Sequence, residues 1–382
     1  MAFRGPRHIG PDPHGRHHPA HAREAARAVR EMKEWGKKRT LSIAKRNHYL
    51  PQFYLEAFLS KVEPRVFWVF DKKGGPPRPQ TPINTGVEGH LYNIEMPDGS
   101  IDDSFERQVF APVEALSKPL IARLQEPGAR MSPDDAQVLA TFLGFMATRV
   151  PRTINAVQEI GGAIAIHMLQ DLAEKPERLR RALTELQEQG KLDKDITLDQ
   201  ARELLENAEK GVEYSMDRKA AMGMALLTAQ EIHRDLLDMK WSLFEAPRGF
   251  QFLTGDMPLV CFVPSPDGTA LFGAGSGLRA VEVTFPISPE KCLFLSRGIE
   301  RGHCQIHKNY VMELNRRTAW AAERFIIARD NERFVARLAK WASKSAGMKK
   351  IDRKAMLLYL KASRALTDES LETTLTEDPV EK

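Results

Sequence analysis

The chain has 382 residues, of which 42% are hydrophobic and 28% are charged. This composition is typical of a water-soluble globular protein with a sizeable core, and no apolar run reaches the roughly 18 residues that a membrane helix needs. The first residues contain no apolar segment of a secretory signal, and three cysteines without C-x-x-C spacing do not form a disulfide framework. We therefore expect a cytoplasmic protein with no membrane partner.

The net charge of +5 is spread unevenly along the chain. Residues 1–47 contain twelve Lys and Arg but four Asp and Glu, whereas residues 366–382 contain one Lys and six acidic residues. We therefore predict a basic, disordered or helical leader over 1–45, a single domain over 46–364 and an acidic disordered tail over 365–382. A basic arm of this kind can contact nucleic acid, which is the partner we expect.

The stretch NHYLPQFYL at residues 47–55 opens the predicted domain. Proline is tolerated in the first turn of a helix, so Pro51 indicates a helix start. His48 lies just before this start and Gln52 just after it, where backbone N–H groups favour an anion. These two side chains are candidates for holding an anionic group or orienting a water molecule. The alternative is that both are satisfied structural groups.

A helix beginning near residue 101 carries Glu106 and Glu114, eight residues apart. Two turns place these carboxylates on one face about 12 Å apart, too far for one acid/base pair without a third group between them. A solvated acidic face is the alternative. Ser132 predicts the N-cap of the next, largely apolar helix, which ends near Arg149 and Arg152. A guanidinium at such a place usually has a carboxylate or phosphate partner.

Helical patterns continue to about residue 240 and include a charged hairpin over 174–211. Short β-rich segments separated by Pro or Gly turns follow from residue 241. We therefore predict an α+β fold, with a central helical region over about 100–240. A mostly antiparallel sheet is expected from residues about 65–95 and 241–330. The aromatic side chains expected to be buried are Trp68, Phe142, Phe145, Trp241 and Phe252.

The segment NHYLPQFYLEAF resembles the opening motif of the bacterial domain-of-unknown-function family 4238. The resemblance extends over residues about 46–330. Further segments similar to that family follow in order: GHLY at 89–92, the acidic helix from Glu106 to Glu114, TGDMP at 254–258 with Gly255 where Ser or Thr is usual, FPISP at 285–289, and Val311 to Asn315. The family name implies no activity, so the resemblance identifies candidate residues without naming their chemistry.

Two classes of function follow from these residues. The first is a hydrolase acting on a phosphodiester or nucleic-acid substrate, with defence against foreign nucleic acid as one setting. The second is a non-enzymatic binding module in which the motif residues form a structural polar core. The candidate catalytic residues are His48, Gln52, Asp256, Glu106 and Glu114, with His48, Gln52 and Asp256 expected to meet. The candidate substrate-binding residues are Tyr49, Arg149, Arg152 and Asn315. No metal ligand is predicted, and no cofactor is identified.

The basic leader generates a first prediction. Deleting residues 1–40 is expected to weaken binding to a nucleic acid and to flatten its salt dependence, because fewer counterions are released when fewer cations contact phosphates. Binding measured over a series of salt concentrations checks this. Equal affinity and equal salt dependence with and without the leader would contradict it.

Overall fold

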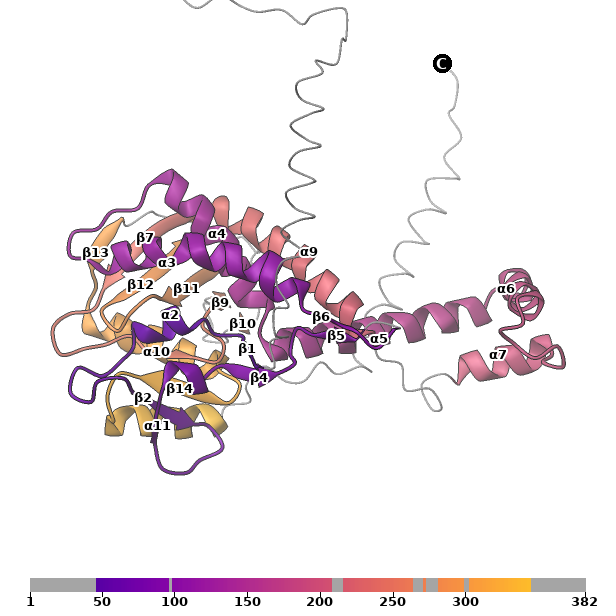
Figure 1. The fold of residues 1–382 in the computed structure, drawn as a ribbon, viewed down its shortest axis with the longest axis horizontal. Coiled ribbons are helices and arrows are strands. Elements are labelled where there is room, and N and C mark those ends of the chain that lie inside the picture. The colour runs from indigo at the N-terminus through magenta and orange to yellow at the C-terminus, as the bar shows by residue number, and fades with distance from the viewer. Residues whose placement is uncertain are drawn as a thin grey trace, which may run out of the picture. The chain divides into compact units, whose positions relative to one another are not determined.

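The computed structural model of the chain describes residues 46–95, 98–207, 216–263, 271–272, 281–298 and 302–344. The predictions for the basic leader and the acidic tail lie outside these residues. The fold is α+β, as the sequence predicts, with helices concentrated between two groups of strands (Figure 1).

The larger sheet has six strands in the order β10-β9-β11-β12-β7-β13. All its pairs are antiparallel except that of β13 with β7. Its strands are β7 (Lys240–Glu245), β9 (Val260–Val263), β10 (Leu271–Phe272), β11 (Glu282–Pro286), β12 (Lys291–Ser296) and β13 (His303–Gln305).

A second, four-stranded sheet has the order β3-β2-β14-β8. It pairs strands from near the beginning and near the end of the region that resembles the family. Its strands are β2 (Phe67–Asp71), β3 (Arg78–Gln80), β8 (Thr254–Gly255) and β14 (Phe325–Ala328). Two small ribbons pair β1 (Arg46–His48) with β4 (Val87–Gly89) and β5 (Ile94–Glu95) with β6 (Ile101–Asp102). The predicted strands therefore divide between two main sheets.

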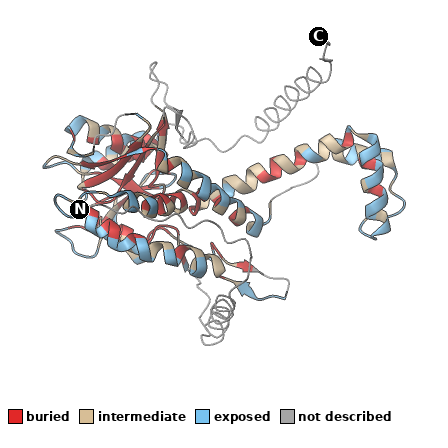
Figure 2. Ribbon diagram, turned by 90° about the horizontal axis from the view of Figure 1, so that it is seen from above, coloured by how far each residue is buried: buried red, intermediate tan, exposed pale blue. Residues whose placement is uncertain are grey.

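Helices cover both faces of the six-stranded sheet, whose strands are largely buried (Figures 1 and 2). Side chains alternate between the faces of a strand, so Leu293 and Leu295 of β12 pack with the helical layer while Phe294 faces the other side. The helical layer consists of α3 (Ala111–Gln125), α4 (Pro133–Thr148) and α9 (Arg218–Leu237). The opposite face is covered by α10 (Lys308–Ala321).

Local sequence signals define several helix ends. The predicted N-cap Ser132 begins α4 with a complete capping box, in which its hydroxyl and the Asp135 carboxylate each accept a backbone N–H. The charged hairpin forms α6 (Pro176–Glu188) and α7 (Leu198–Glu206), which share a small core with the last turn of α5 (Pro151–Ala173). The C-terminal helix of the described chain, α11 (Arg333–Lys344), packs on β2 and β14.

Most of the aromatic side chains predicted to be buried lie in the core. Phe142, Trp241 and Phe252 are buried, whereas Phe145 and Trp68 are partly exposed. Phe145 contacts the Phe110 ring but lies at the edge of a shallow surface hollow beside α9. No helix within the described ranges has the length and apolar character to cross a membrane.

The packing of α4 generates a second prediction. Phe142 is 1% exposed, and its ring centroid lies 5.8 Å from that of Phe53 and 6.0 Å from that of Phe285. Phe142→Ala is expected to lower the free energy of unfolding by about 3–5 kcal/mol, because it removes a buried ring and leaves a cavity. Chemical denaturation measures this. Val62→Ala is the control, since Val62 is 82% exposed, and a Phe142→Ala loss no larger than the control's would refute the packing.

Candidate functional site

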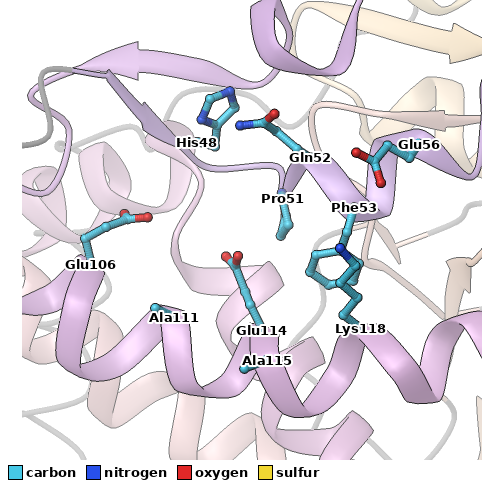
Figure 3. Close-up of a pocket in the computed structure, with 10 residues that line it drawn as sticks. All are labelled: His48, Pro51, Gln52, Phe53, Glu56, Glu106, Ala111, Glu114, Ala115 and Lys118. Atoms are coloured by element: carbon cyan, nitrogen blue, oxygen red, sulfur yellow. The ribbon is translucent and has the colours of Figure 1, made fainter. Parts of the chain in front are cut away.

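One cavity of about 480 Å³ gathers four of the five candidate catalytic residues. Figure 3 shows Glu106 and Glu114 directed into it from one side, with His48 and Gln52 on the opposite wall. The elements that line it are β1, α2 (Gln52–Glu56), the π-helix η2 (Phe105–Phe110) and α3. The lining residues are His48, Pro51, Gln52, Phe53, Glu56, Glu106, Ala111, Glu114, Ala115 and Lys118.

A tight chain crossing fixes the wall that carries His48. The backbone N–H groups of Tyr49 and Leu50 both donate to the carbonyl of Gly86, at 2.8 and 3.2 Å. Gly86 has φ +64°, and a Cβ there would lie 2.5 Å from the Leu50 Cβ. Only glycine therefore allows this approach, which sets the direction of β1 into α2. Pro51 is the residue before α2 rather than a position within the helix.

His48 is held as a neutral imidazole. Its Nε2 lies 3.1 Å from the carbonyl oxygen of Ile83, which can only accept, so the ring proton is on Nε2. Burial lowers the pKa of His48, and nearby Arg46 and Arg149 lower it further, against the opposing effects of the Ile83 hydrogen bond and Glu114. Nδ1 has no hydrogen-bond partner among the described residues and carries a free lone pair. Such a nitrogen can act as a general base.

Glu106 has the opposite character. It lies in the π-helix that precedes α3, where the wider turn changes the direction of its side chain relative to a regular helix. Its Oε2 is shielded from solvent and has no partner at hydrogen-bond distance within the described chain, although the Asn47 amide lies near enough to affect its pKa. Burial raises the pKa of Glu106, and the effect outweighs the pull of Arg149 and of the Asn47 amide in the other direction. A carboxyl group in this environment retains its proton more readily and can act as a general acid.

Glu114 forms an ion pair with a buried arginine. The Arg149 guanidinium, 2% exposed, donates to Glu114 Oε1 at 2.6 Å and to the backbone carbonyl of His48. Its Nε lies 3.4 Å from the Tyr92 hydroxyl, which in turn donates to the Arg149 carbonyl at 2.9 Å. Burial disfavours the charged guanidinium, but Tyr92 and Glu114 outweigh it, so the pKa of Arg149 lies above its usual range. Arg149 does not line the cavity, but it binds Glu114 and the His48 backbone, which do lie at the cavity wall.

Two charged residues of the cavity were not among the sequence candidates. Glu56 lies four residues after Gln52 on α2, and Lys118 lies four residues after Glu114 on α3. Residues four apart share a helix face, so helical spacing from the two named candidates is the signal that identifies both. Ala111 and Ala115 lie on the same wall, and their small side chains leave the space open.

Asp256 does not join His48 and Gln52, which corrects the sequence expectation. Asp256 is buried at the junction between α10 and β14, where its carboxylate accepts the backbone N–H groups of Glu323 at 2.9 Å and Arg324 at 2.7 Å. Lys72 completes this junction by donating to the carbonyls of Trp320 and Ala322. Both carboxylate oxygens of Asp256 therefore accept backbone N–H groups, and the residue does not line the cavity.

The other candidate binding residues also lie elsewhere. Tyr49 follows His48 directly, and its buried side chain is close enough to Asp256 for that carboxylate to affect its pKa. The Asn315 amide of α10 accepts from the N–H of Leu253 at 2.9 Å and donates to the carbonyl of Gln251 at 2.8 Å. Arg152, in the first turn of α5, is absent from the cavity lining. Their sequence positions near helix ends and turns did not indicate which side of the fold they face.

The family-like segments nevertheless meet, through a different residue. The hydroxyl of Tyr54, fully buried in α2, donates to the Pro286 carbonyl at 2.9 Å and lies 2.6 Å from the Thr254 hydroxyl. One phenol therefore links the first motif to the TGDMP turn and to the FPISP strand end. No group of three or more His, Cys, Asp or Glu side chains among the residues described is arranged to hold a metal ion.

The burial of Asp256 generates a third prediction. Desolvation raises its pKa to about 6, against the backbone hydrogen bonds from Arg324 and Glu323. Because the folded-state pKa exceeds the unfolded value, the folded state binds the proton more tightly. The contribution of Asp256 to the free energy of unfolding is therefore fully present at low pH. It falls by about 3 kcal/mol as the pH rises from about 4 to about 6.

Urea denaturation of the wild type and Asp256→Asn over that pH range checks this. The variant is expected to lack this component of the pH dependence, because its side chain does not titrate. The exposed Asp195→Asn is the control and should follow the wild type. A constant difference between the wild type and Asp256→Asn across the range would contradict the assignment.

Comparison with known proteins gives one match. A family described as a protein of unknown function (DUF4238) matches residues 46–332. No curated protein and no solved structure matches the chain. The match covers both sheets, the cavity and the Tyr54 contacts. Since it spans well over half of the 382 residues, the chain belongs to the DUF4238 family.

Proposed function

We propose that the protein is a hydrolase that cleaves a phosphodiester bond of RNA by general acid–base catalysis. The observation that carries the proposal is the pairing of environments in one cavity. A neutral His48 with a free ring nitrogen lines the same cavity as Glu106, whose buried carboxyl group tends to keep its proton. Two titratable groups with pKa values shifted in opposite directions are the usual arrangement of a base and an acid.

RNA suits this pair because its 2′-hydroxyl supplies the nucleophile. In the proposed first step His48 Nδ1 takes the 2′-hydroxyl proton, the 2′-oxygen attacks phosphorus, and the 5′-oxygen leaves with the proton of Glu106. In the second step the ionised Glu106 takes a proton from water, which opens the cyclic phosphate, and His48 returns its proton to the 2′-oxygen. Both side chains then regain their starting protonation states.

The remaining charged groups of the site support an anionic substrate. Glu114 is neutralised by Arg149, and the charge of Glu56 is balanced by that of Lys118. With Glu106 protonated, the cavity therefore carries no net charge and does not repel a phosphate. Lys118 would contact the phosphate as a point charge. Gln52, at the start of α2, would hydrogen-bond a phosphate oxygen or the ribose.

A non-enzymatic role is the second candidate, and specific contacts favour it. Tyr54, Asn315 and Asp256, which all lie in family-like segments, use their polar atoms to join elements within the fold. In this alternative the motifs form a structural polar core, and the cavity binds a ligand without catalysing a reaction. The three cysteines are free thiols, which supports the cytoplasmic location we propose for either role.

The proposal generates a fourth prediction, concerning Glu106→Gln and the pH–rate profile. Cleavage of a fluorophore- and quencher-labelled single-stranded RNA should fall by about 10²–10⁴-fold in Glu106→Gln, because glutamine cannot transfer a proton. The wild-type rate should be highest at mildly acidic pH. It falls at lower pH as His48 gains a proton and at higher pH as Glu106 loses one, since burial lowers the first pKa and raises the second.

Two controls separate catalysis from stability. Glu63→Gln makes the same chemical change at an exposed position outside the cavity and should leave the rate unchanged. The 2′-deoxy form of the same oligonucleotide should remain intact. If the wild type leaves the RNA intact at every pH tested, or if Glu106→Gln loses stability in proportion to activity, the structural alternative is preferred.

A further inference from the structure

Helix α11 carries four cations in a single stripe. Its twelve residues, RFVARLAKWASK, contain no acidic residue. At 3.6 residues per turn the spacing of four, three and four residues keeps all four cations within an arc of roughly 60°. The four cations are Arg333, Arg337, Lys340 and Lys344, and all are exposed.

The opposite face of α11 is fixed in the fold. Val335, Ala339 and Ala342 are buried and pack in one cluster with residues of β2 and β14, such as Phe70 and Ile326. The helix is therefore anchored through its apolar face, and its cationic stripe points away from the sheet. An amphipathic helix that binds a membrane must insert its apolar face into the lipid. That face is occupied here, which argues against a lipid surface as the partner.

Aromatic side chains lie beside the stripe. Phe334 and Trp341 are each 37% exposed and seven residues apart, so they lie on the same side of α11. The guanidinium of Arg316, on α10, lies 4.9 Å from the centre of the Trp341 ring. An exposed aromatic surface next to a line of cations is the combination with which proteins bind single-stranded nucleic acid, by contacting phosphates and stacking bases.

The charges of the stripe are not compensated locally. None of its four cations forms an ion pair within the part of the chain that the structure describes. The two acidic groups that directly precede α11 are already engaged. Asp330 accepts a hydrogen bond from the Ser60 hydroxyl, and Glu332 accepts one from Gln251. On α10, Glu313 pairs with Arg316 and Arg317. Among the residues that the structure describes, the stripe therefore presents an unneutralised line of charge about 16 Å long.

We propose that α11 is a docking surface for single-stranded nucleic acid, with the cationic stripe along the phosphates and Trp341 against a base. A line of four cations about 16 Å long can follow several consecutive phosphates of one strand. The proposal stands on the residues of α10 and α11 and does not depend on the hydrolase activity, because docking at this surface requires no residue of the cavity.

The test measures binding of fluorescein-labelled oligodeoxythymidylate to the full chain by anisotropy over a series of salt concentrations. This probe has no 2′-hydroxyl, so the proposed cleavage cannot affect the readout. Replacing all four cations of the stripe by glutamine should weaken binding at least tenfold at low salt. It should also make the log–log salt dependence shallower by about 3, at roughly 0.7 per lost phosphate contact. Trp341→Ala should weaken binding about tenfold and leave the salt dependence unchanged.

The matched control removes four exposed cations from the α6–α7 hairpin, through Arg178→Gln, Arg181→Gln, Lys191→Gln and Lys194→Gln. It changes the net charge equally and should leave binding near the wild-type level. Equal losses in the two quadruple variants would show a net-charge effect and overturn the proposal. So would a stripe variant that binds the oligonucleotide normally but no longer binds phosphatidylserine vesicles. Circular dichroism and thermal unfolding confirm that each variant is folded.

Discussion

The buried guanidinium of Arg149 is the constraint on which the candidate site depends. An unpaired charge at 2% exposure would be strongly unfavourable, so its partners are required rather than optional. Glu114 neutralises the charge of the guanidinium. The His48 carbonyl accepts a hydrogen bond from it, and the Tyr92 hydroxyl lies 3.4 Å from its Nε. Because these partners come from α3, β1 and the loop after β4, one side chain at the end of α4 sets the distance between the two walls of the cavity.

Arg149 also explains why the two glutamates of one helical segment differ. Glu114 forms an ion pair with the guanidinium, whereas Glu106 lies in the π-helix with a buried oxygen that has no hydrogen-bond partner among the described residues. Burial raises the pKa of the Glu106 carboxyl group. One cavity therefore holds a glutamate paired with a cation and a glutamate whose buried oxygen has no hydrogen-bond partner among the described residues.

The family-like motifs serve two purposes that sequence alone does not separate. His48 and Gln52 line the cavity, but Tyr54 of the same motif ties α2 to β8 and β11 through one hydroxyl group. His48, the last residue of β1, lines the cavity, whereas Tyr49, the next residue along the chain, lies near Asp256. A motif at the junction of two sheets thus supplies both cavity-lining side chains and packing contacts.

The sequence by itself determined the local features of this protein. The Ser132 cap, the charged hairpin and the segregation of helices from strands all follow from short-range patterns. The gathering of His48, Gln52, Glu106 and Glu114 in one cavity joins segments more than fifty residues apart and is a result of the tertiary structure. Only the tertiary structure decided the division of strands between two sheets and the position of Asp256. The pairing of β2 with β14, about 250 residues apart, depends on contacts that periodicity does not encode, and so do the two backbone hydrogen bonds to the Asp256 carboxylate.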